Sequence, residues 1–285
     1  MATGRRTTAD VLRAGADYLA RHGVDSPRAT AETLLMRLVE TDRAGLYSGR
    51  DGLDQRTARL FARSLCARCR GTPVQYLTGE QQFRGLTLAV QPGVLIPRPE
   101  TELLVDAAVA ALPPETSPVV VDVGTGTGAV ALAIKHSRPD SRVLATDVSA
   151  EATETARGNA GALDLEIEVF DGDLFDPLPV MLRGVVDVVV SNPPYLTEEE
   201  YESLPEEVRA EPFDALVGGT EVHRRLVAES PEWLKEGGWL VVEIGAGQGR
   251  DVRVLLEEGR FEDVEVIRDL AGRDRIVRGR LARPA

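Results

Sequence analysis

Cysteine, histidine and lysine are scarce in this chain, whose 285 residues include two cysteines, three histidines and two lysines. Cys66 and Cys69 form a C-x-x-C pair. A zinc site takes about four ligands, and so few histidines without a second cysteine pair leave that set incomplete. We therefore expect no metal site, and the two cysteines are simplest to interpret as those of a reduced, cytoplasmic protein.

Long apolar runs are also missing. None approaches the roughly 18 residues that a helix needs to span a bilayer, so we expect no membrane segment. The first ten residues, MATGRRTTAD, carry two arginines without an apolar stretch behind them. We therefore expect no signal peptide, which again favours a cytoplasmic location.

Positive charge is short overall, because the formal net charge is -13. It is unevenly spread: residues 1–75 hold 13 Arg against 8 Asp and Glu, whereas the rest of the chain has a net charge of -18. Sequence-independent binding to DNA or RNA relies on Lys and Arg that neutralise phosphates. The acidic main body therefore argues against stable nucleic-acid binding, although it leaves room for a local basic channel.

Two regions of different character divide the chain. Apolar residues at helical spacing predict several short helices between residues 8 and 70, which would form a small bundle. Gly and Pro then punctuate short β-like runs such as Leu86–Val90. We expect a helical domain at 1–75, a linker with a β-hairpin at 76–98, and a second domain at 99–285.

Strands alternate with helices from Val119 onward. Apolar, β-branched runs predict strands at 119–123, 142–147, 165–170, 185–190, 238–244, 262–268 and 275–281. Helices fit between them at about 127–136, 150–161, 220–235 and 247–258. Helical crossovers indicate a doubly wound α/β sheet. The gap before the final strand is too short for a crossover, so we expect a seven-stranded, mostly parallel sheet with an antiparallel last strand.

A glycine-rich turn, GTGTG, follows the first of these strands. Gly124, Gly126 and Gly128 let the backbone turn tightly and approach a ligand, and Thr125 and Thr127 lie between them. In dinucleotide-binding proteins a similar turn places a pyrophosphate at a helix N-terminus. The spacing fits that use as well, so the turn alone does not separate a dinucleotide from another adenosine-containing cofactor.

Acidic residues follow the neighbouring strands. Asp147 lies 23 residues after Gly124 and can accept hydrogen bonds from both hydroxyls of a ribose. Asp122 could bind the same ligand or only brace the loop. After the third strand, Asp173 could contact an adenine amino group while Leu174 packs on the ring, and a simple polar turn explains them equally well.

A second glycine-rich segment, VVEIGAGQGRD at residues 241–251, resembles the first. It contains Gly245, Gly247 and Gly249, and Glu265 follows about 20 residues later. Glu265 falls in the middle of an alternating strand pattern, where a side chain points to solvent. We therefore interpret this segment as a strand-to-helix turn and not as the cofactor loop.

The fourth strand ends in SNPPYL, an unusual termination. A Pro-Pro pair fixes the backbone and removes two N–H donors. The groups left facing outward are the Asn192 side-chain carbonyl, the Pro193 backbone carbonyl and, after Pro194, the Tyr195 ring. Two acceptors beside an aromatic face suit a planar –NH2 group, whose hydrogens they hold while its lone pair points at an electrophile.

These segments, taken together, resemble a known family. The resemblance rests on PVQYLTGEQQFRGL, VLIPRPETE, VVDVGTGTGAVALA, SNPPYL and RDLAGRDRIVRGR, in this order, and covers nearly the whole chain. In these features the sequence is similar to the peptide chain release factor N5-glutamine methyltransferases (the HemK/PrmC family). They are class I S-adenosylmethionine-dependent methyltransferases.

The resemblance implies transfer of a methyl group from S-adenosylmethionine to the side-chain amide of the glutamine in the Gly-Gly-Gln segment of release factors. It implies that the loop from Gly124 to Gly128, Asp147 and Asn192 hold the cofactor, with Asp173 and Leu174 at its adenine. Asn192 to Tyr195 would grip the glutamine, LIPRPETE would line the pocket, and the helical domain would help to dock the release factor. Family members often carry an aromatic residue where this chain has Leu174.

The expected chemistry needs alignment more than a base. A sulfonium is a strong methyl donor, so holding the amide nitrogen in line with the methyl group is the main task. We identify no Asp, Glu or His near SNPPYL as a required base, and the acidic run from Glu198 to Glu211 predicts a mobile loop beside the substrate mouth.

Three other functions fit parts of the pattern. An adenine-N6 nucleic-acid methyltransferase would use the same grip on an amino group, although the acidic charge and the lack of a separate base-recognition domain disfavour it. A ribosomal-protein glutamine methyltransferase is a related alternative. A catalytically inactive binding module is a third, which the intact Asn192 and glycine loop oppose.

Overall fold

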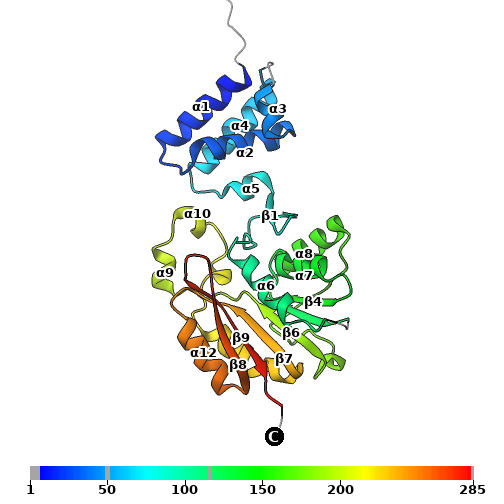
Figure 1. The fold of residues 1–285 in the computed structure, drawn as a ribbon. Coiled ribbons are helices and arrows are strands. Elements are labelled where there is room, and N and C mark those ends of the chain that lie inside the picture. Colours follow the sequence, from blue (N-terminus) through cyan, green and yellow to red (C-terminus); the bar gives the residue numbers. More distant parts are fainter. Residues whose placement is uncertain (1–6, 49–51, 115–116, 284–285) are drawn as a thin grey trace, which may run out of the picture. The chain divides into compact units, whose positions relative to one another are not determined.

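A computed structural model describes residues 7–48, 52–114 and 117–283. The first six residues, on which the expectation of no signal peptide partly rests, lie outside this range. The chain divides into two compact units, one comprising residues up to Glu80 with Pro205–Ala210, the other Gln81–Leu204 with Glu211–Ala285 (Figure 1). Along the described parts of the chain, no helix is both long enough and apolar enough to cross a bilayer.

The N-terminal unit is helical, as predicted. Its helices are α1 (Thr8–Arg21), α2 (Pro27–Val39), α3 (Arg43–Ser48), α4 (Gln55–Arg68), α5 (Val74–Thr78) and α10 (Glu206–Arg209). The apolar faces of α1 to α5 meet in one core that includes Leu19, Leu35 and Phe61. The acidic run after Glu198 therefore contains α10, together with α9 (Glu198–Glu202), and the prediction of a loop there was wrong.

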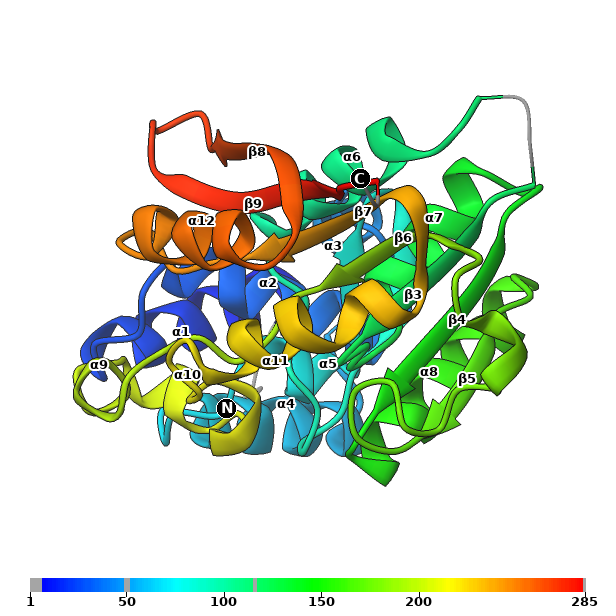
Figure 2. The same cartoon turned by 90° about the horizontal axis from the view of Figure 1, so that it is seen from below.

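The second unit contains the sheet. Its seven strands are β3 (Val119–Val123), β4 (Arg142–Asp147), β5 (Glu168–Asp171), β6 (Val186–Ser191), β7 (Leu234–Glu243), β8 (Phe261–Arg268) and β9 (Asp274–Leu281). Figure 2 shows them in the order β5-β4-β3-β6-β7-β9-β8. The five neighbouring strands β5, β4, β3, β6 and β7 are parallel to one another. Strand β9 lies between β7 and β8 and is antiparallel to both. The predicted seven-stranded sheet with an antiparallel last strand is confirmed.

Helices and a hairpin complete this unit. The helices are α6 (Thr101–Ala111), α7 (Ala129–Ser137), α8 (Ala150–Leu163), α11 (Glu221–Glu229) and α12 (Gly249–Glu258), with short 3-10 turns at Val180–Leu182, Phe213–Ala215 and Ser230–Glu232. The segment predicted to be a linker contains a two-stranded hairpin, β1 (Glu80–Phe83) and β2 (Leu86–Ala89).

Two predicted boundaries differ from the structure. The strand predicted from residue 165 begins at Glu168, because the Leu165 N–H still closes the end of α8 on the Ala160 carbonyl, at 3.1 Å. The helix predicted to reach residue 235 ends at Glu229. Pro231 has no N–H to bond the Val227 carbonyl, so the α-helical hydrogen bonds stop there, and Leu234 already pairs with Val186 of β6.

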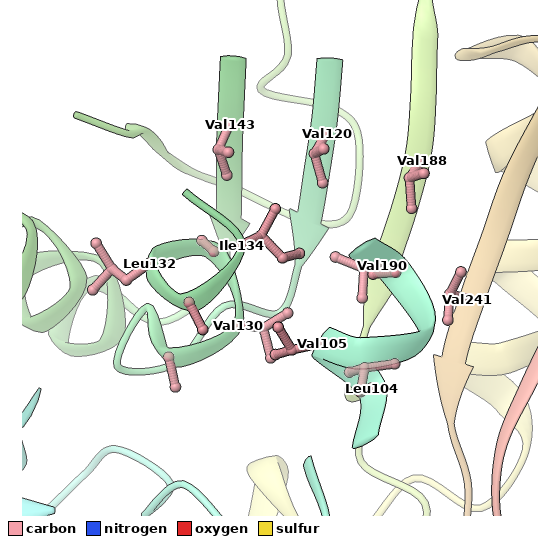
Figure 3. Close-up of a cluster of buried hydrophobic side chains, with 14 of the residues drawn as sticks. Leu104, Val105, Val120, Val130, Leu132, Ile134, Val143, Val188, Val190 and Val241 are labelled. Atoms are coloured by element: carbon pink, nitrogen blue, oxygen red, sulfur yellow. The ribbon is translucent and has the colours of Figure 1, made fainter. Parts of the chain in front are cut away.

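Alternating side chains of the strands pack against helices on both faces of the sheet. Val120, Val143 and Val190 meet α6 and α7 on one face, as Figure 3 shows. Their sequence neighbours, such as Val121 and Leu144, pack on the other face in a cluster that includes residues of α11 and α12. All six residues of β6 are buried, as expected for a central strand covered on both sides. This burial holds the end of β6, and the segment that follows it, in one place.

One glycine allows α7 and α8 to approach closely. Gly128 precedes α7 with a φ of 82°, in the left-handed region that favours glycine. A Cβ atom there would lie 3.1 Å from the Ala156 Cβ of α8. Gly158, also on α8, has an ordinary φ, and a Cβ atom at that position would meet nothing within 4 Å.

We expect Gly128→Ala to lower the free energy of unfolding by about 1–3 kcal/mol, because it adds left-handed strain and a tight contact. The matched variant Gly158→Ala should raise it by up to about 1 kcal/mol, because alanine is the better helix former. Urea unfolding followed by circular dichroism measures both. Equal effects of the two substitutions would contradict this account.

Candidate active site

A cavity of about 660 Å³ opens at the carboxyl ends of the parallel strands. Its walls come from the segments that follow β3, β4, β5 and β6, from residues 93–97, from the first residue of α6 and from α11. Strand β3 lies between β4 and β6, so the chain crosses in opposite directions on its two sides. In open α/β sheets this reversal of strand order leaves a crevice in which ligands bind.

The loop after β3 forms one wall. Gly124 and Gly126 have φ angles of 72° and 57°, and a Cβ atom on either would meet nothing within 4 Å. Their missing side chains therefore leave open space against the backbone. Gly124, Thr125, Gly126 and Thr127 all line the cavity, whereas Gly128 does not and serves the packing of α7.

The N–H groups of this loop are bonded within the protein. Gly124 and Thr125 both donate to the Thr146 carbonyl, at 2.9 and 3.0 Å, and Gly126 donates to Asp147 Oδ2 at 2.8 Å. A pyrophosphate bound as in dinucleotide enzymes would need such N–H groups to be free. These three N–H groups are therefore not available to bind a phosphate.

Asp147 ends β4 and braces the cavity. Its Oδ2 accepts from Gly126, and its Oδ1 accepts from the Ser149 N–H at 2.9 Å. Each oxygen keeps a second lone pair, so the carboxylate can also accept from a ligand. Burial raises the pKa of Asp147, and the two N–H donors oppose that shift.

Asp122 lies deeper and mainly holds the loop. Its Oδ2 accepts from the Thr125 hydroxyl at 2.6 Å and from the Ala131 N–H at 3.1 Å. The side chain is almost fully buried, and this burial raises its pKa to about 7. Of the two roles left open for Asp122, these contacts support bracing.

Asp173 and Leu174 follow β5 and line the cavity. Asp173 is bonded to Arg225 of α11, with 2.9 Å between Oδ2 and a guanidinium nitrogen. Leu174 is buried with a φ of 43° and turns into the core under this wall. Nothing in the sequence pattern had singled out Arg225, because α11 enters the cavity from a distant part of the chain.

The segment after β6 forms the opposite wall. Asn192, Pro193 and Pro194 line the cavity, and the Asn192 Nδ2 donates to the Thr101 hydroxyl oxygen at 3.2 Å. With its nitrogen so engaged, the Asn192 amide directs its oxygen elsewhere. Tyr195 does not line this cavity.

A small recess of about 40 Å³ adjoins the cavity. It is lined by Leu95, Arg98, Asn192, Pro193, Tyr195, Leu196, Ala215 and Leu216. Asn192 and Pro193 line both spaces and therefore form their common wall. A space of this volume has room for a small polar group such as a carboxamide.

The second glycine-rich segment supports this recess. Gly245 and its neighbours have no left-handed φ angles, unlike the first loop. The Gln248 side chain donates to the Tyr195 carbonyl at 2.7 Å and accepts from the Gly245 N–H at 2.9 Å. Glu265 is exposed and pairs with Arg278. The segment is thus a structural turn, as expected from the sequence, and it holds Tyr195 in place.

Glu243 is an acidic neighbour that the sequence pattern did not reveal. It ends β7, is 1% exposed, and accepts from the Tyr195 hydroxyl at 3.4 Å. Burial raises its pKa to about 7, and burial also raises the pKa of Tyr195, which is therefore a neutral phenol. The signal that could have found Glu243 is its position, because the carboxyl end of β7 lies beside that of β6.

The charges around the cavity indicate the kind of ligand it suits. Its lining contains Asp122, Asp147, Glu151, Asp173 and Asp214, and the one cation among the described lining residues is Arg225, already paired with Asp173. Such a wall repels phosphates and attracts a cation. Among adenosine-containing cofactors, this favours one that carries a sulfonium and an ammonium over a dinucleotide.

Comparisons with known proteins agree with these features. The family model "Methyltransferase small domain" matches residues 99–272, and the model "PrmC N-terminal domain" matches residues 10–79. A methyltransferase structure from Pyrococcus furiosus shares the fold, with a TM-score of 0.51, 19% identity, and coverage of 70% of this chain and 90% of that one.

Curated relatives are closer in sequence. The release factor glutamine methyltransferase of Mycolicibacterium smegmatis is 42% identical over 270 residues, covering 93% of this chain and 95% of the relative. That of Moorella thermoacetica is 40% identical over 265 residues, covering 90% and 92%. Full-length similarity at this level, together with the matched family models, shows that the chain belongs to the family of release factor glutamine methyltransferases.

Proposed function

We propose that this protein transfers a methyl group from S-adenosylmethionine to the side-chain amide nitrogen of the glutamine in the Gly-Gly-Gln segment of peptide chain release factors. The observation that carries the proposal is the common wall of Asn192 and Pro193, which borders both the large cavity and the small recess. A cofactor in the first space and a carboxamide in the second would meet at these two residues.

The residues of the large cavity suit the cofactor. The space left by the missing side chains of Gly124 and Gly126 would let the cofactor lie against the backbone of the loop. The free lone pairs of Asp147 suit the two ribose hydroxyls. Asp173 and Leu174 line the same cavity and would border the adenine. When bound, S-adenosylmethionine supplies a methyl group that its sulfonium activates for transfer.

Asn192 and Pro193 orient the substrate amide. Their carbonyl oxygens accept its two N–H hydrogens, so the nitrogen keeps one approach direction, toward the large cavity. An amide nitrogen is a weak nucleophile, and fixed alignment is the main contribution available from these residues. The two residues would hold the nitrogen in line with the methyl group that the cofactor supplies, and the proton that the amide loses on methylation would pass to water.

The ring of Tyr195 forms one wall of the recess. Its hydroxyl is held by Glu243 and its carbonyl by Gln248, so the ring is fixed before a substrate arrives. Arg98 and Glu211 stabilise the facing segment, because Arg98 pairs with Glu211, which also accepts from the Ile96 N–H at 3.0 Å. A preformed slot of this kind lowers the entropic cost of holding a flexible glutamine.

The alternatives explain the site less well. An adenine-N6 methyltransferase would have to bring the phosphate chain of a nucleic acid to this cavity, and the acidic lining would oppose that chain. Release factors act at the ribosome, so the proposal also places this enzyme in the cytoplasm. The helical N-terminal unit is then the natural candidate for docking the rest of the release factor.

The test is to incubate the purified protein with a release factor and S-adenosylmethionine, and to map methylation by tandem mass spectrometry of proteolytic peptides. We expect one added methyl group, located on the glutamine of the Gly-Gly-Gln segment. A release factor with that glutamine changed to alanine is the control and should remain unmodified. Methylation of an adenine-containing RNA or DNA, with none on the release factor, would overturn the proposal.

A further inference from the structure

The recess has one charged side chain among the described residues that line it, that of Arg98. The other lining side chains are apolar, apart from Asn192 and Tyr195. Asn192 turns its nitrogen toward the Thr101 hydroxyl oxygen, at 3.2 Å, and the Tyr195 hydroxyl donates to Glu243, at 3.4 Å. Arg98 is therefore the main source of side-chain donors for a ligand in this recess.

Glu211 holds Arg98 in place. The Glu211 side chain is 1% exposed, and one of its oxygens pairs with Nη2 of Arg98. The other oxygen accepts from the Ile96 N–H at 3.0 Å, so the same carboxylate also fixes the backbone that carries Arg98. A buried carboxylate without a positive partner is costly, which favours this arrangement. The Arg98 side chain itself is 31% exposed, and its remaining N–H groups can donate to a ligand.

A carboxamide has two polar ends of opposite kind. Its –NH2 group donates two hydrogen bonds, and its oxygen accepts them. In the proposed function, the carbonyl oxygens of Asn192 and Pro193 accept from the –NH2 group. The oxygen of the same carboxamide still needs a donor, because a polar atom that leaves water without a new partner is costly to bury.

We propose that Arg98 binds the carbonyl oxygen of the substrate glutamine and thereby fixes which end of the carboxamide meets Asn192. The two ends are nearly alike in shape, so packing does not distinguish them. Turned end for end, the carboxamide would place its oxygen against two carbonyl oxygens and its –NH2 group against a cation, and both contacts are repulsive. This inference rests on the proposed function and adds a substrate-binding residue to it.

The positive charge of Arg98 also suits the reaction. An amide that is methylated on its nitrogen gives up one N–H proton, and the negative charge that this loss leaves is shared with the amide oxygen. A guanidinium that is hydrogen-bonded to this oxygen stabilises the charge as it develops. We therefore expect Arg98 to contribute to kcat as well as to the binding of the glutamine.

The first experiment is a binding cycle between the two proteins. Calorimetry in the presence of S-adenosylhomocysteine compares the unaltered enzyme with Arg98→Met. Each binds a release factor whose Gly-Gly-Gln glutamine is intact or changed to alanine. We expect the glutamine to strengthen binding to the unaltered enzyme about tenfold or more, and to strengthen binding to Arg98→Met less than about threefold. A general change in the enzyme would weaken both release factors alike.

The second experiment separates Arg98 from its ion pair. Arg98→Met alone would leave the Glu211 carboxylate buried without its partner, so kcat is also measured for Glu211→Gln and for the double variant. We expect Glu211→Gln to keep kcat within about fivefold, since the guanidinium remains, whereas the double variant should lose about 30-fold or more. Arg98→Lys should recover part of that loss, because an ammonium also donates.

Two controls accompany these variants. The affinity of each for S-adenosylhomocysteine should stay within about threefold of the unaltered value, which shows that the site is folded. Arg142→Met removes an arginine that also pairs with a glutamate, Glu168, at 2.7 Å. Arg142 begins β4, at the edge of the sheet opposite the cavity, so its loss should change release-factor binding and kcat less than about twofold.

The outcomes separate the two proposals. If the unaltered enzyme does not methylate a release factor, the proposed function fails. If it does, and the glutamine keeps its full binding advantage in Arg98→Met, the assignment of Arg98 to the amide oxygen is wrong. Equal losses of kcat in Glu211→Gln and in the double variant would also overturn it, since they would mean that the ion pair acts only through the structure.

Discussion

Asn192→Ala should lower kcat for glutamine methylation by about two to three orders of magnitude, while affinity for S-adenosylhomocysteine changes less than about tenfold. The reason is the position of this side chain in the common wall of the cavity and the recess. Alanine removes one of two acceptors for the substrate amide, and the nitrogen can then rotate out of line. In the proposed site, the cofactor is held mainly by the loop after β3 and by Asp147, which this variant leaves intact.

Single-turnover kinetics with a release factor, combined with calorimetry of the product cofactor, measure the two quantities separately. Thr197→Ala is a suitable control, because Thr197 is an exposed polar residue five positions later that only caps α9. Its kcat should stay within about twofold, since losing a cap affects mainly local stability. A near-normal kcat for Asn192→Ala would remove the chemical basis of the proposed function.

Asp147→Ala should weaken binding of S-adenosylmethionine and S-adenosylhomocysteine by about 30- to 300-fold. The carboxylate offers acceptors to a ribose and also holds the N–H groups of Gly126 and Ser149. Losing charged hydrogen bonds of this kind costs about 2–3 kcal/mol, and about 1.4 kcal/mol corresponds to a tenfold change in affinity.

Isothermal calorimetry with S-adenosylhomocysteine gives the affinity directly. Asp171→Ala is the matched control, because Asp171 ends the neighbouring strand β5, is exposed and pairs with Arg157 outside the cavity. Its affinity should equal that of the unaltered protein. Comparable losses in both variants would indicate a general effect of removing acidic charge and would refute a specific ribose contact.

Two features explain why much of the site could be predicted. They are the spacing of apolar residues along the chain and the position of the site residues just after strands. The sheet was predictable because β-branched runs of four to eight residues recur between helical segments. The GTGTG turn, Asp147, Asp173 and SNPPYL all follow predicted strands, and parallel strands bring their carboxyl ends to one edge. A local pattern is therefore enough to gather them, whatever the details of packing.

Site residues that do not follow a strand could not be predicted in this way. Arg225 comes from α11, which lies far from the first strands in the sequence, and it follows no strand. The boundary errors near residues 165 and 230 have a related cause. There, a helix cap and a proline override the average propensity of the segment.

The amino-acid sequence by itself determined the α/β class, the family, and which segments follow the strands and line the cavity. These depend on the spacing of apolar residues and on short motifs. Tertiary structure alone decided how the glycine loop is used, since its N–H groups are bonded to Thr146 and Asp147 and are not free for phosphate. It also decided that the Glu243 carboxylate accepts from the Tyr195 hydroxyl and that the Asn192 amide donates to Thr101. Hydrogen-bond direction and burial depend on neighbours far apart in the chain, and these become neighbours only when the sheet is assembled.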